Sequence, residues 1–468
     1  MELRQFLHTL TYGSLAAGVV SVVTTIAYPE NNSSVLSVTK PFGFGDGRDW
    51  FFEKRFGMFV HLGLYAIHGW HEQHQFRARV PRSEYVKLKE QWNPHRFNPD
   101  EWLDLLEEAG MKYLTFTTKH INIFCLWDTK QISLNTMNTP YGRYILKMVS
   151  YAYHRRNIPL CLYYYNVDNN HPNYPNKGRN HEIPPPPGDS PNVGKYIDYM
   201  RAQVTELCIN YGNIHGFWWD AIRLREDVDQ DPGLNQLIRK LQHGVVINNR
   251  GFDDGDFGIA ERDYGSDDEI SFDRPIQACQ AVGMENWGYR KNEDYYNDRH
   301  LIRSIDTYLS RDASYLLNFG PDPLGVISEQ DRRILKNIGR WYETVNESFR
   351  HVEPASQLTS NRNVMLTQRK NTLYVHLNKD PEGNVFKLRP FTVAPRTATL
   401  LNTGEKVEFE LEFAPQDYMV QKSYLRLINL PTNEMCNTVL VIKLEFDRPP
   451  EECVQANTML DKINEEQK

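Results

Sequence analysis

The sequence predicts an α/β protein, a (β/α)8-like TIM barrel followed by a C-terminal β-sandwich, and three observations support this. In the 468-residue chain, short apolar runs alternate with amphipathic helical segments about seven or eight times between residues 41 and 352, which favours a parallel sheet. Several runs end in a residue that can do chemistry, as barrel strands do. From residue 353 the helical pattern vanishes and strand-like runs with turns remain.

The predicted barrel covers residues 41–352. Its candidate strands are residues 56–64, 112–120, 158–166, 214–221, 244–250, 278–287 and 313–319. Helices are expected between them, for example at residues 99–109, where Asp100 and Glu101 suit a helix N-terminus, and at residues 193–211. A segment of this length favours a closed barrel over an open sheet.

Five consecutive strands end in a side chain suited to binding or catalysis: His61, His120, Tyr164, Asp220 and Arg250. Each alone would more often be structural. In a (β/α) barrel, however, the active site is assembled from the carboxyl ends of the strands. The sequence therefore predicts a site there.

The remaining segments are less regular. The polar loop 166–192 contains four consecutive prolines, so it is expected to be an extended surface segment. It either rims the site or is a variable insertion. Residues 353–450 are predicted as the β-sandwich, with strands at 371–377, 396–401, 407–413, 423–430 and 437–446. Residues 451–468 form a charged tail.

Residues 1–40 are predicted to be an export signal and linker. Arg4 precedes an apolar stretch from residue 10 to residue 28, which is the pattern of export signals, and residues 3–7 resemble a twin-arginine signal without its first arginine. The expected location is periplasmic or extracellular. An uncleaved membrane anchor and a soluble core helix are the alternatives.

Charge and cysteine spacing exclude some functions. The net charge of −7 and the pI near 6.1 provide no basic field for nucleic acid. The six cysteines show no zinc-site spacing, so no metal is expected. Aromatic residues make up 12% of the chain, which suits a carbohydrate site because sugar faces stack on such rings, although most aromatic residues are expected in the core. No oligomeric state can be predicted.

Asp220 is the candidate nucleophile of a glycosidase. Glycoside hydrolysis needs two carboxyl groups that flank the scissile bond. Asp220 ends the bulky strand segment Gly216-Phe217-Trp218-Trp219-Asp220, where a carboxylate needs a polar pocket or partners. From the local pattern alone, a helix cap explains Asp220 equally well.

Seven ordered segments resemble motifs of one enzyme family: residues 55–65, 119–128, 162–164, 217–220, 247–251, 286–289 and 316–321. The first is similar to a strand that usually reads FGxFxHWG, and Lys119-His120 is similar to the start of KHHDGF. The chain thus resembles the α-L-fucosidases of glycoside hydrolase family 29, and its β-sandwich also suits that family.

The resemblance implies a retaining exo-glycosidase that removes terminal α-L-fucosyl residues by double displacement, with Asp220 as nucleophile and no metal or organic cofactor. Its substrate would be a fucosylated oligosaccharide or glycoconjugate. The implied sugar-binding residues are His61, Glu72, His120, Tyr164, Trp218, Arg250 and Trp287. Trp218 would pack against the 6-methyl group of the sugar.

Two glutamates compete for the acid/base role. Glu261 lies where one subgroup of the family has this residue, and Glu285 suits the position found in the other subgroup. Met284 and Trp287 could raise the pKa of Glu285 by desolvation, whereas Glu261 lies in a charge-rich segment. We favour Glu261 and retain Glu285 as the rival.

Five positions depart from the family motifs, which have Trp, Trp and His where this chain has Leu62, Gln73 and Ile121, and Asp-Gly where it has Asn122-Ile123. Because Ile121 cannot hydrogen-bond, an unpaired sugar hydroxyl there would cost ~1–3 kcal/mol. The alternatives are therefore a modified fucose, another α-L-glycoside, or a catalytically inactive glycan-binding barrel. His74 could compensate for the lost histidine. For His68, His71 and His215 we expect core positions with hydrogen bonds to backbone.

Overall fold

The computed structural model describes residues 43–176, 182, 187–221, 232–262, 272–413 and 423–454. The predicted export signal, most of the charged tail and residues 184–186 of the proline run lie outside these ranges. Within them, no helix combines the length and the apolar character needed to cross a bilayer.

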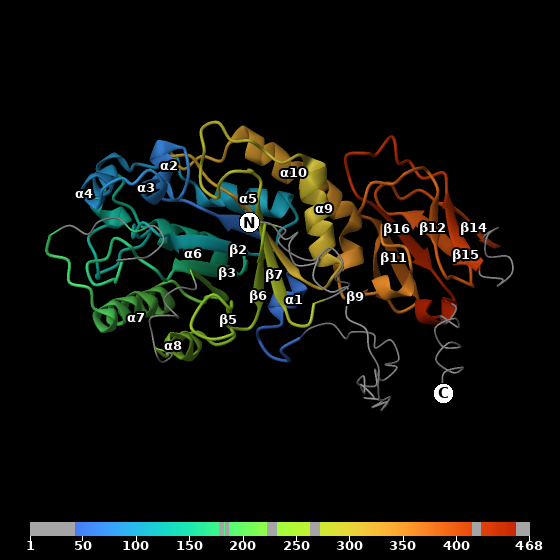
Figure 1. Cartoon of the computed structure of the whole chain (residues 1–468), viewed down its shortest axis with the longest axis horizontal. Coiled ribbons are helices and arrows are strands. Elements are labelled where there is room, and N and C mark those ends of the chain that lie inside the picture. Colours follow the sequence, from blue (N-terminus) through green and yellow to red (C-terminus); the bar gives the residue numbers. More distant parts are fainter. Residues whose placement is uncertain are drawn as a thin grey trace, which may run out of the picture. The chain divides into compact units, whose positions relative to one another are not determined.

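Eight parallel strands form one sheet, which can be followed in Figure 1. They are β1 (Phe56–Val60), β2 (Leu114–Lys119), β3 (Leu160–Tyr165), β4 (Gly216–Asp220), β5 (Val246–Ile247), β6 (Gly258–Glu261), β7 (Ile276–Ala281) and β8 (Ser314–Phe319). Their spatial order is β5-β4-β3-β2-β1-β8-β7-β6. β1 pairs with both β2 and β8, as the first strand of a barrel must.

A parallel bridge between Asn248 and Phe257 connects the two ends of this sheet. The N–H of Asn249 donates to the Phe257 carbonyl at 3.0 Å, and the N–H of Asp256 donates to the Ile247 carbonyl at 2.7 Å. The sheet therefore closes just after β5, and the predicted (β/α)8-like barrel is confirmed. The sequence did not predict β6, which has only four residues, three of them half-buried.

Helices connect most of the strands. The longer ones are α5 (Pro99–Glu108), α6 (Ile145–Arg155), α7 (Val193–Asn210), α8 (Leu234–Leu241), α9 (Asp298–Leu309) and α10 (Glu329–Val345). The short ones are α1 (Trp50–Glu53), α2 (Tyr65–His68), α3 (His74–Arg77) and α4 (Arg82–Tyr85), and the 3-10 turns are Val86–Gln91, Thr136–Asn138, Asn346–Phe349, Ser356–Leu358 and Pro450–Cys453. α5 begins as predicted, because the Asn98 side chain accepts from the Asp100 N–H. No helix separates β5 from β6.

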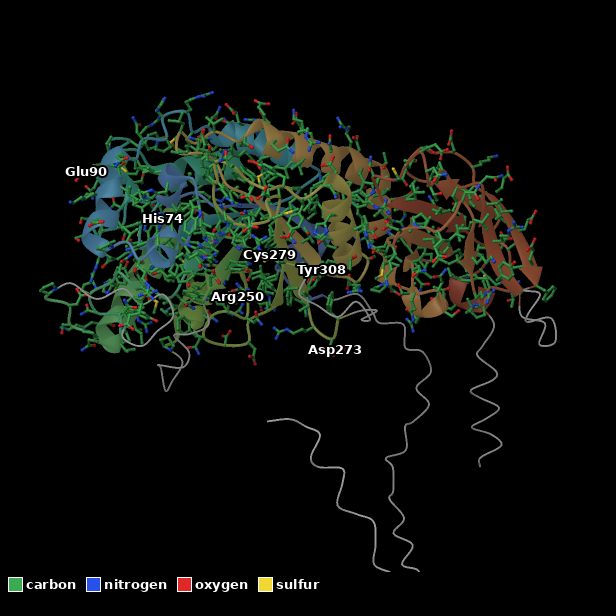
Figure 2. The ribbon with its side chains drawn as sticks, turned by 45° about the horizontal axis from the view of Figure 1, so that its top comes forward. His74, Glu90, Arg250, Asp273, Cys279 and Tyr308 are labelled. Carbon is green, nitrogen blue, oxygen red and sulfur yellow. The ribbon has the colours of Figure 1, made fainter. Side chains whose placement is uncertain are left out.

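Side chains alternate between two apolar layers along each strand. On β4, Phe217 and Trp219 face the helices, and the Trp219 indole donates to Asn235 of α8 at 2.8 Å. Trp218 faces the barrel interior with Phe59 and Tyr163. This alternation decides which strand residues can reach the site. Figure 2 labels Arg250 and Cys279 among the strands of the barrel, and Glu90 at the periphery of the barrel.

The C-terminal part is a β-sandwich of two antiparallel sheets, as predicted. Its strands are β9 (Glu353–Pro354), β10 (Met365–Arg369), β11 (Thr372–Leu377), β12 (Phe386–Leu388), β13 (Thr397–Leu400), β14 (Glu408–Phe413), β15 (Ser423–Ile428) and β16 (Leu440–Glu445). One sheet has the order β13-β16-β11-β10-β9 and the other β12-β15-β14. Buried residues of both sheets, such as Leu373 and Leu427, form the core between them.

Candidate active site

Arg250 joins the two candidate catalytic carboxylates. Its Nη1 donates to Asp220 Oδ1 at 2.9 Å, and its Nη2 forms an ion pair with Glu261. The side chains of Asp220 and Glu261 are 21% and 35% exposed, so both are accessible from solvent. Because the two nitrogens share one carbon, the carboxylates that they bind lie close together, and a retaining mechanism needs its two carboxyl groups ~5–5.5 Å apart.

The backbone turns sharply directly after both carboxylates. Ala221 has φ 68° and Arg262 has φ 52°, a left-handed conformation that residues other than glycine rarely adopt. Asp220 Oδ1 also accepts the Ala221 N–H at 2.9 Å. Such strained positions cluster at functional sites, and here they fix the direction of the side chain at each strand end.

Tyr163 on β3 completes the contacts of Asp220, and it was not predicted as a site residue. Its hydroxyl donates to Asp220 Oδ2 at 2.6 Å. Its ring stacks on Trp218 at 5.4 Å and lies parallel to the His120 ring at 5.6 Å. Tyr163 therefore both orients the carboxylate and forms part of an aromatic wall.

The prediction that Tyr164 binds the sugar is wrong. Its side chain is fully buried on the outer face of β3, where the hydroxyl donates to Gln203 of α7 at 2.7 Å and accepts from Lys119 Nζ at 2.9 Å. Neighbouring strand residues point to opposite faces, so only one of Tyr163 and Tyr164 can face the site. A run of three tyrosines, residues 163–165, hides this register in the sequence.

Phenylalanine substitutions test this register. Tyr163→Phe removes a donor to Asp220 and should lower kcat/KM by about tenfold, the loss expected for a hydrogen bond to a charged group. Tyr164→Phe should lower the free energy of unfolding by about 1 kcal/mol and leave kcat/KM unchanged. Steady-state kinetics and urea unfolding of both variants separate the effects. The opposite pattern would place Tyr164 in the site.

His61 and His120, both predicted to bind the sugar, lie beside this wall. Both are buried, with ring centroids 5.5 Å apart. His61 Nδ1 lies 2.6 Å from Asn318 Oδ1, so the imidazole donates there and leaves Nε2 as an acceptor. Burial, followed by the charge of His120, holds the pKa of His61 well below its ordinary value, which keeps the ring neutral. Asn318 was missed, although it lies in a motif that the sequence offered.

Glu72 and Trp287 contact each other at the edge of the same site. The Trp287 N–H donates to Glu72 Oε2 at 3.0 Å, and the Trp287 ring lies 5.7 Å from that of His61. Trp287 is tied further, because its carbonyl accepts from Asn318 Nδ2 at 2.6 Å. Burial raises the pKa of Glu72 from 4.5 to about 6. The structure thus brings together the predicted site residues other than Tyr164 and the rival Glu285.

The raised pKa of Glu72 predicts a pH-dependent stability. The folded protein holds this proton more tightly than the unfolded chain, so the stabilisation is full below pH 4.5 and is lost as pH rises through about 6. The shift corresponds to about 2 kcal/mol. The free energy of unfolding of Glu72→Gln minus that of wild type should therefore rise by about 2 kcal/mol from about pH 4 to pH 8. Urea titrations measure this, with the exposed Glu285→Gln as control. A flat difference for Glu72→Gln would refute it.

In the described part of the chain, Glu285 forms no ion pair with Arg250, which binds only Asp220 and Glu261. It is exposed, as is Met284 at 44%, so the predicted desolvation of Glu285 by its neighbours does not occur. Its N–H donates to Glu293 at 3.2 Å. Of the two rivals for the acid/base role, the structure brings only Glu261 to Asp220.

The remaining histidines differ in their surroundings. His71 is buried and accepts the Gln73 N–H at 3.0 Å, and His215 is half-buried and accepts the Leu160 N–H at 3.4 Å, both in agreement with a structural role. The prediction of a core position is wrong for His68, which is exposed and stacks on His74 at 4.0 Å. His74 Nδ1 is buried.

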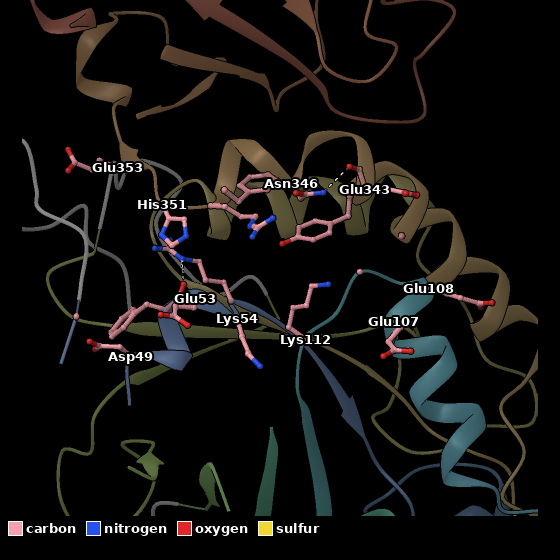
Figure 3. A pocket seen from close by; sticks show the side chains of 18 residues that line it. Asp49, Glu53, Lys54, Glu107, Glu108, Lys112, Glu343, Asn346, His351 and Glu353 are labelled. Carbon is pink, nitrogen blue, oxygen red and sulfur yellow. Dashed lines mark hydrogen bonds between the residues drawn. The ribbon is translucent and has the colours of Figure 1, made fainter. Parts of the chain in front are cut away.

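A cavity of about 1050 Å³ lies at the opposite end of the barrel (Figure 3). Arg55 and Lys112, which line it, precede β1 and β2, so it adjoins the amino ends of the strands. Acidic and basic side chains are mixed around it, with Glu107 and Glu343 on α5 and α10. Barrel active sites form at the carboxyl ends, so this cavity is not the candidate site. Among the described residues, no group of His, Cys, Asp or Glu side chains could hold a metal ion.

Comparisons with known proteins identify the family of this chain. A family model described as alpha-L-fucosidase matches residues 44–347. Tissue alpha-L-fucosidase of Bos taurus is 23% identical over 408 residues, which cover 82% of this chain and 86% of that protein. The rat enzyme (Rattus norvegicus) is 25% identical over 385 residues, with 76% and 82% covered.

Solved structures share the fold. Alpha-L-fucosidase isoenzyme 1 from Paenibacillus thiaminolyticus superimposes with a TM-score of 0.76 at 30% identity, over 86% of this chain and 100% of that one. A trapped covalent intermediate of a family 29 alpha-L-fucosidase from Bacteroides thetaiotaomicron gives 0.73 at 24% identity, over 87% and 98%. The chain belongs to the α-L-fucosidase family of glycoside hydrolases.

Proposed function

We propose that this protein is a retaining exo-α-L-fucosidase that acts on fucosylated oligosaccharides or glycoconjugates. The observation that carries the proposal is the pair of strand-end carboxylates, Asp220 and Glu261, held by the Arg250 guanidinium. Membership of the α-L-fucosidase family supports the choice of sugar.

The reaction takes two displacements at the anomeric carbon. In the first, Asp220 attacks this carbon while Glu261 donates a proton to the leaving oxygen, so the bond to the aglycone breaks and a fucosyl ester forms. In the second, Glu261 takes a proton from water, whose oxygen attacks the same carbon and releases Asp220. One water molecule is consumed and the anomeric configuration is retained.

The surrounding residues explain how the sugar is held. Arg250, the Ala221 N–H and Tyr163 all donate to Asp220, which fixes the carboxylate for attack. The acceptor nitrogen of His61 and the carboxylate of Glu72 suit sugar hydroxyls. Trp218 lines the barrel interior between Tyr163 and Arg250, and we expect the exposed part of its ring to meet the 6-methyl group.

A panel of aryl glycosides tests the proposal. The enzyme should hydrolyse an aryl α-L-fucoside, and NMR of the first product should show α-L-fucose before mutarotation. Release of β-L-fucose would exclude the retaining mechanism. Binding of fucosides without turnover would favour the inactive glycan-binding barrel.

The Ile121 position favours a second candidate, a family member that acts on a modified fucose or another α-L-glycoside. Ile121 is fully buried and packs with Phe76 and Tyr165, so it offers no hydrogen-bond partner to a sugar hydroxyl. A glycone with a less polar substituent there would leave no hydroxyl unpaired. Faster hydrolysis of such a glycoside than of the plain fucoside would support this candidate.

We also infer export, which rests on the N-terminal sequence alone. Arg4 and the apolar stretch after it support a periplasmic or extracellular location. Cell fractionation of the full chain tests this, and recovery in the cytosolic fraction would contradict it.

A further inference from the structure

Arg262 is a charged residue that the mechanism does not use. It follows Glu261 at the end of β6, and its half-buried guanidinium lies 4.6 Å over the Trp287 ring. Its Nη1 donates to the carbonyls of Met284 at 3.1 Å and Gly283 at 3.4 Å, with the Gln280 amide oxygen at 3.5 Å. All three acceptors are neutral.

The other arginines of this region have carboxylate partners. Arg250 binds Asp220 and Glu261, and Arg290 lies 3.8 Å from Glu293 and 3.6 Å from Asp294. Arg262 forms no ion pair with any acidic residue in the described part of the chain. A guanidinium partly withdrawn from water is costly without a counter-charge, so Arg262 is suited to receive one from a ligand.

The position of Arg262 indicates which part of a substrate it would meet. Glu261 must lie beside the oxygen of the bond that is cleaved, and Arg262 is the next residue. Its acceptors belong to the segment 283–284, where Met284 is exposed, so Arg262 lies at the rim. Only Nη1 donates in the contacts above. Nε and Nη2 can therefore donate two parallel hydrogen bonds to an oxyanion.

We propose that Arg262, backed by Trp287, is an oxyanion subsite on the leaving-group side of the cleaved bond. The preferred substrates then carry a sulfate or carboxylate group on the unit to which fucose is attached. The inference rests on the proposed function. The charge of Arg262 also acts within the site. After burial and the charge of His120, it contributes to lowering the pKa of His61.

Phenyl α-L-fucosides with a sulfonate, a carboxylate or a neutral carboxamide on the ring test the subsite. Arg262→Gln should lower kcat/KM for at least one anionic substrate about tenfold more than for the carboxamide, the loss of a charge-assisted hydrogen bond. Arg262→Lys should recover part of this difference. The matched control Arg290→Gln should keep the wild-type ratios. For each substrate, kcat/KM of the variant is divided by that of wild type, so differences in reactivity between the leaving groups cancel.

The outcomes are distinct. A loss confined to the sulfonate or to the carboxylate supports the subsite and identifies its oxyanion. An equal loss for all three substrates, or none, means that Arg262 only positions Trp287, and the inference falls while the fucosidase proposal stands. If wild type hydrolyses none of the three, the proposed function fails and the inference with it.

Discussion

Asp220→Ala should lower the hydrolysis of an aryl α-L-fucoside by at least about 1,000-fold, because no other group can form the glycosyl ester. The loss should be in kcat, since the sugar contacts of His61, Glu72 and Trp287 remain. The fold should survive, because Asp220 is half-buried at a strand end and packs in no core cluster.

Rescue by azide makes this prediction specific. A small anion can enter the space left by the carboxylate and attack from the same face, so Asp220→Ala with azide should yield β-L-fucosyl azide. The control Asp128→Ala removes a half-buried carboxylate paired with Lys130 and should leave activity unaffected. Full activity of Asp220→Ala would refute the assignment, and loss without rescue would point to a structural role.

Glu261→Ala should have the second largest effect, and its size should depend on the leaving group. A phenyl fucoside needs a proton on its leaving oxygen and should react about 100- to 10,000-fold more slowly, the usual contribution of general acid catalysis. With a dinitrophenyl fucoside the leaving group is dinitrophenolate, a stable anion that needs no proton. The first step should therefore be nearly unaffected by the substitution. The fucosyl ester should accumulate, because the second step still lacks its base.

Glu285→Ala is the matched comparison. Because Glu285 is exposed and, among the described residues, forms no hydrogen bond or ion pair with Arg250 or Asp220, its removal should change neither rate by more than about twofold. If the hydrolysis rate of Glu285→Ala fell in a way that depends on the leaving group, and that of Glu261→Ala did not, Glu285 would be the acid/base instead of Glu261.

Five strand ends could be predicted from the sequence because each of these strands is a compact apolar run that ends in a polar or aromatic residue. The closing strand β6 could not, since a four-residue strand with three half-buried positions has no apolar run. The β-sandwich was predicted from alternating strands such as β14, but short strands such as β9 and β12 were not. Pairing across the sheets is a tertiary property.

The site shows the same limit at the level of single side chains. The motif order pointed to Asp220, yet the run of three tyrosines left the register open, and Tyr163 rather than Tyr164 contacts the carboxylate. The proximity of Glu285 to Met284 and Trp287 in sequence suggested burial, but the loop exposes it. That one guanidinium would bind both carboxylates could not be read from positions so far apart in the chain.

The most direct test of the central claim is to trap the fucosyl-enzyme with 2-fluoro-fucosyl fluoride and locate the label by peptide mass spectrometry. The fluorine at C2 destabilises both transition states, while the fluoride leaving group lets the first step proceed, so the ester should accumulate. We predict one label per chain, on the peptide and side chain of Asp220, and none in Asp220→Ala. A label on Glu261 or another carboxylate, or turnover without any label, would contradict the account.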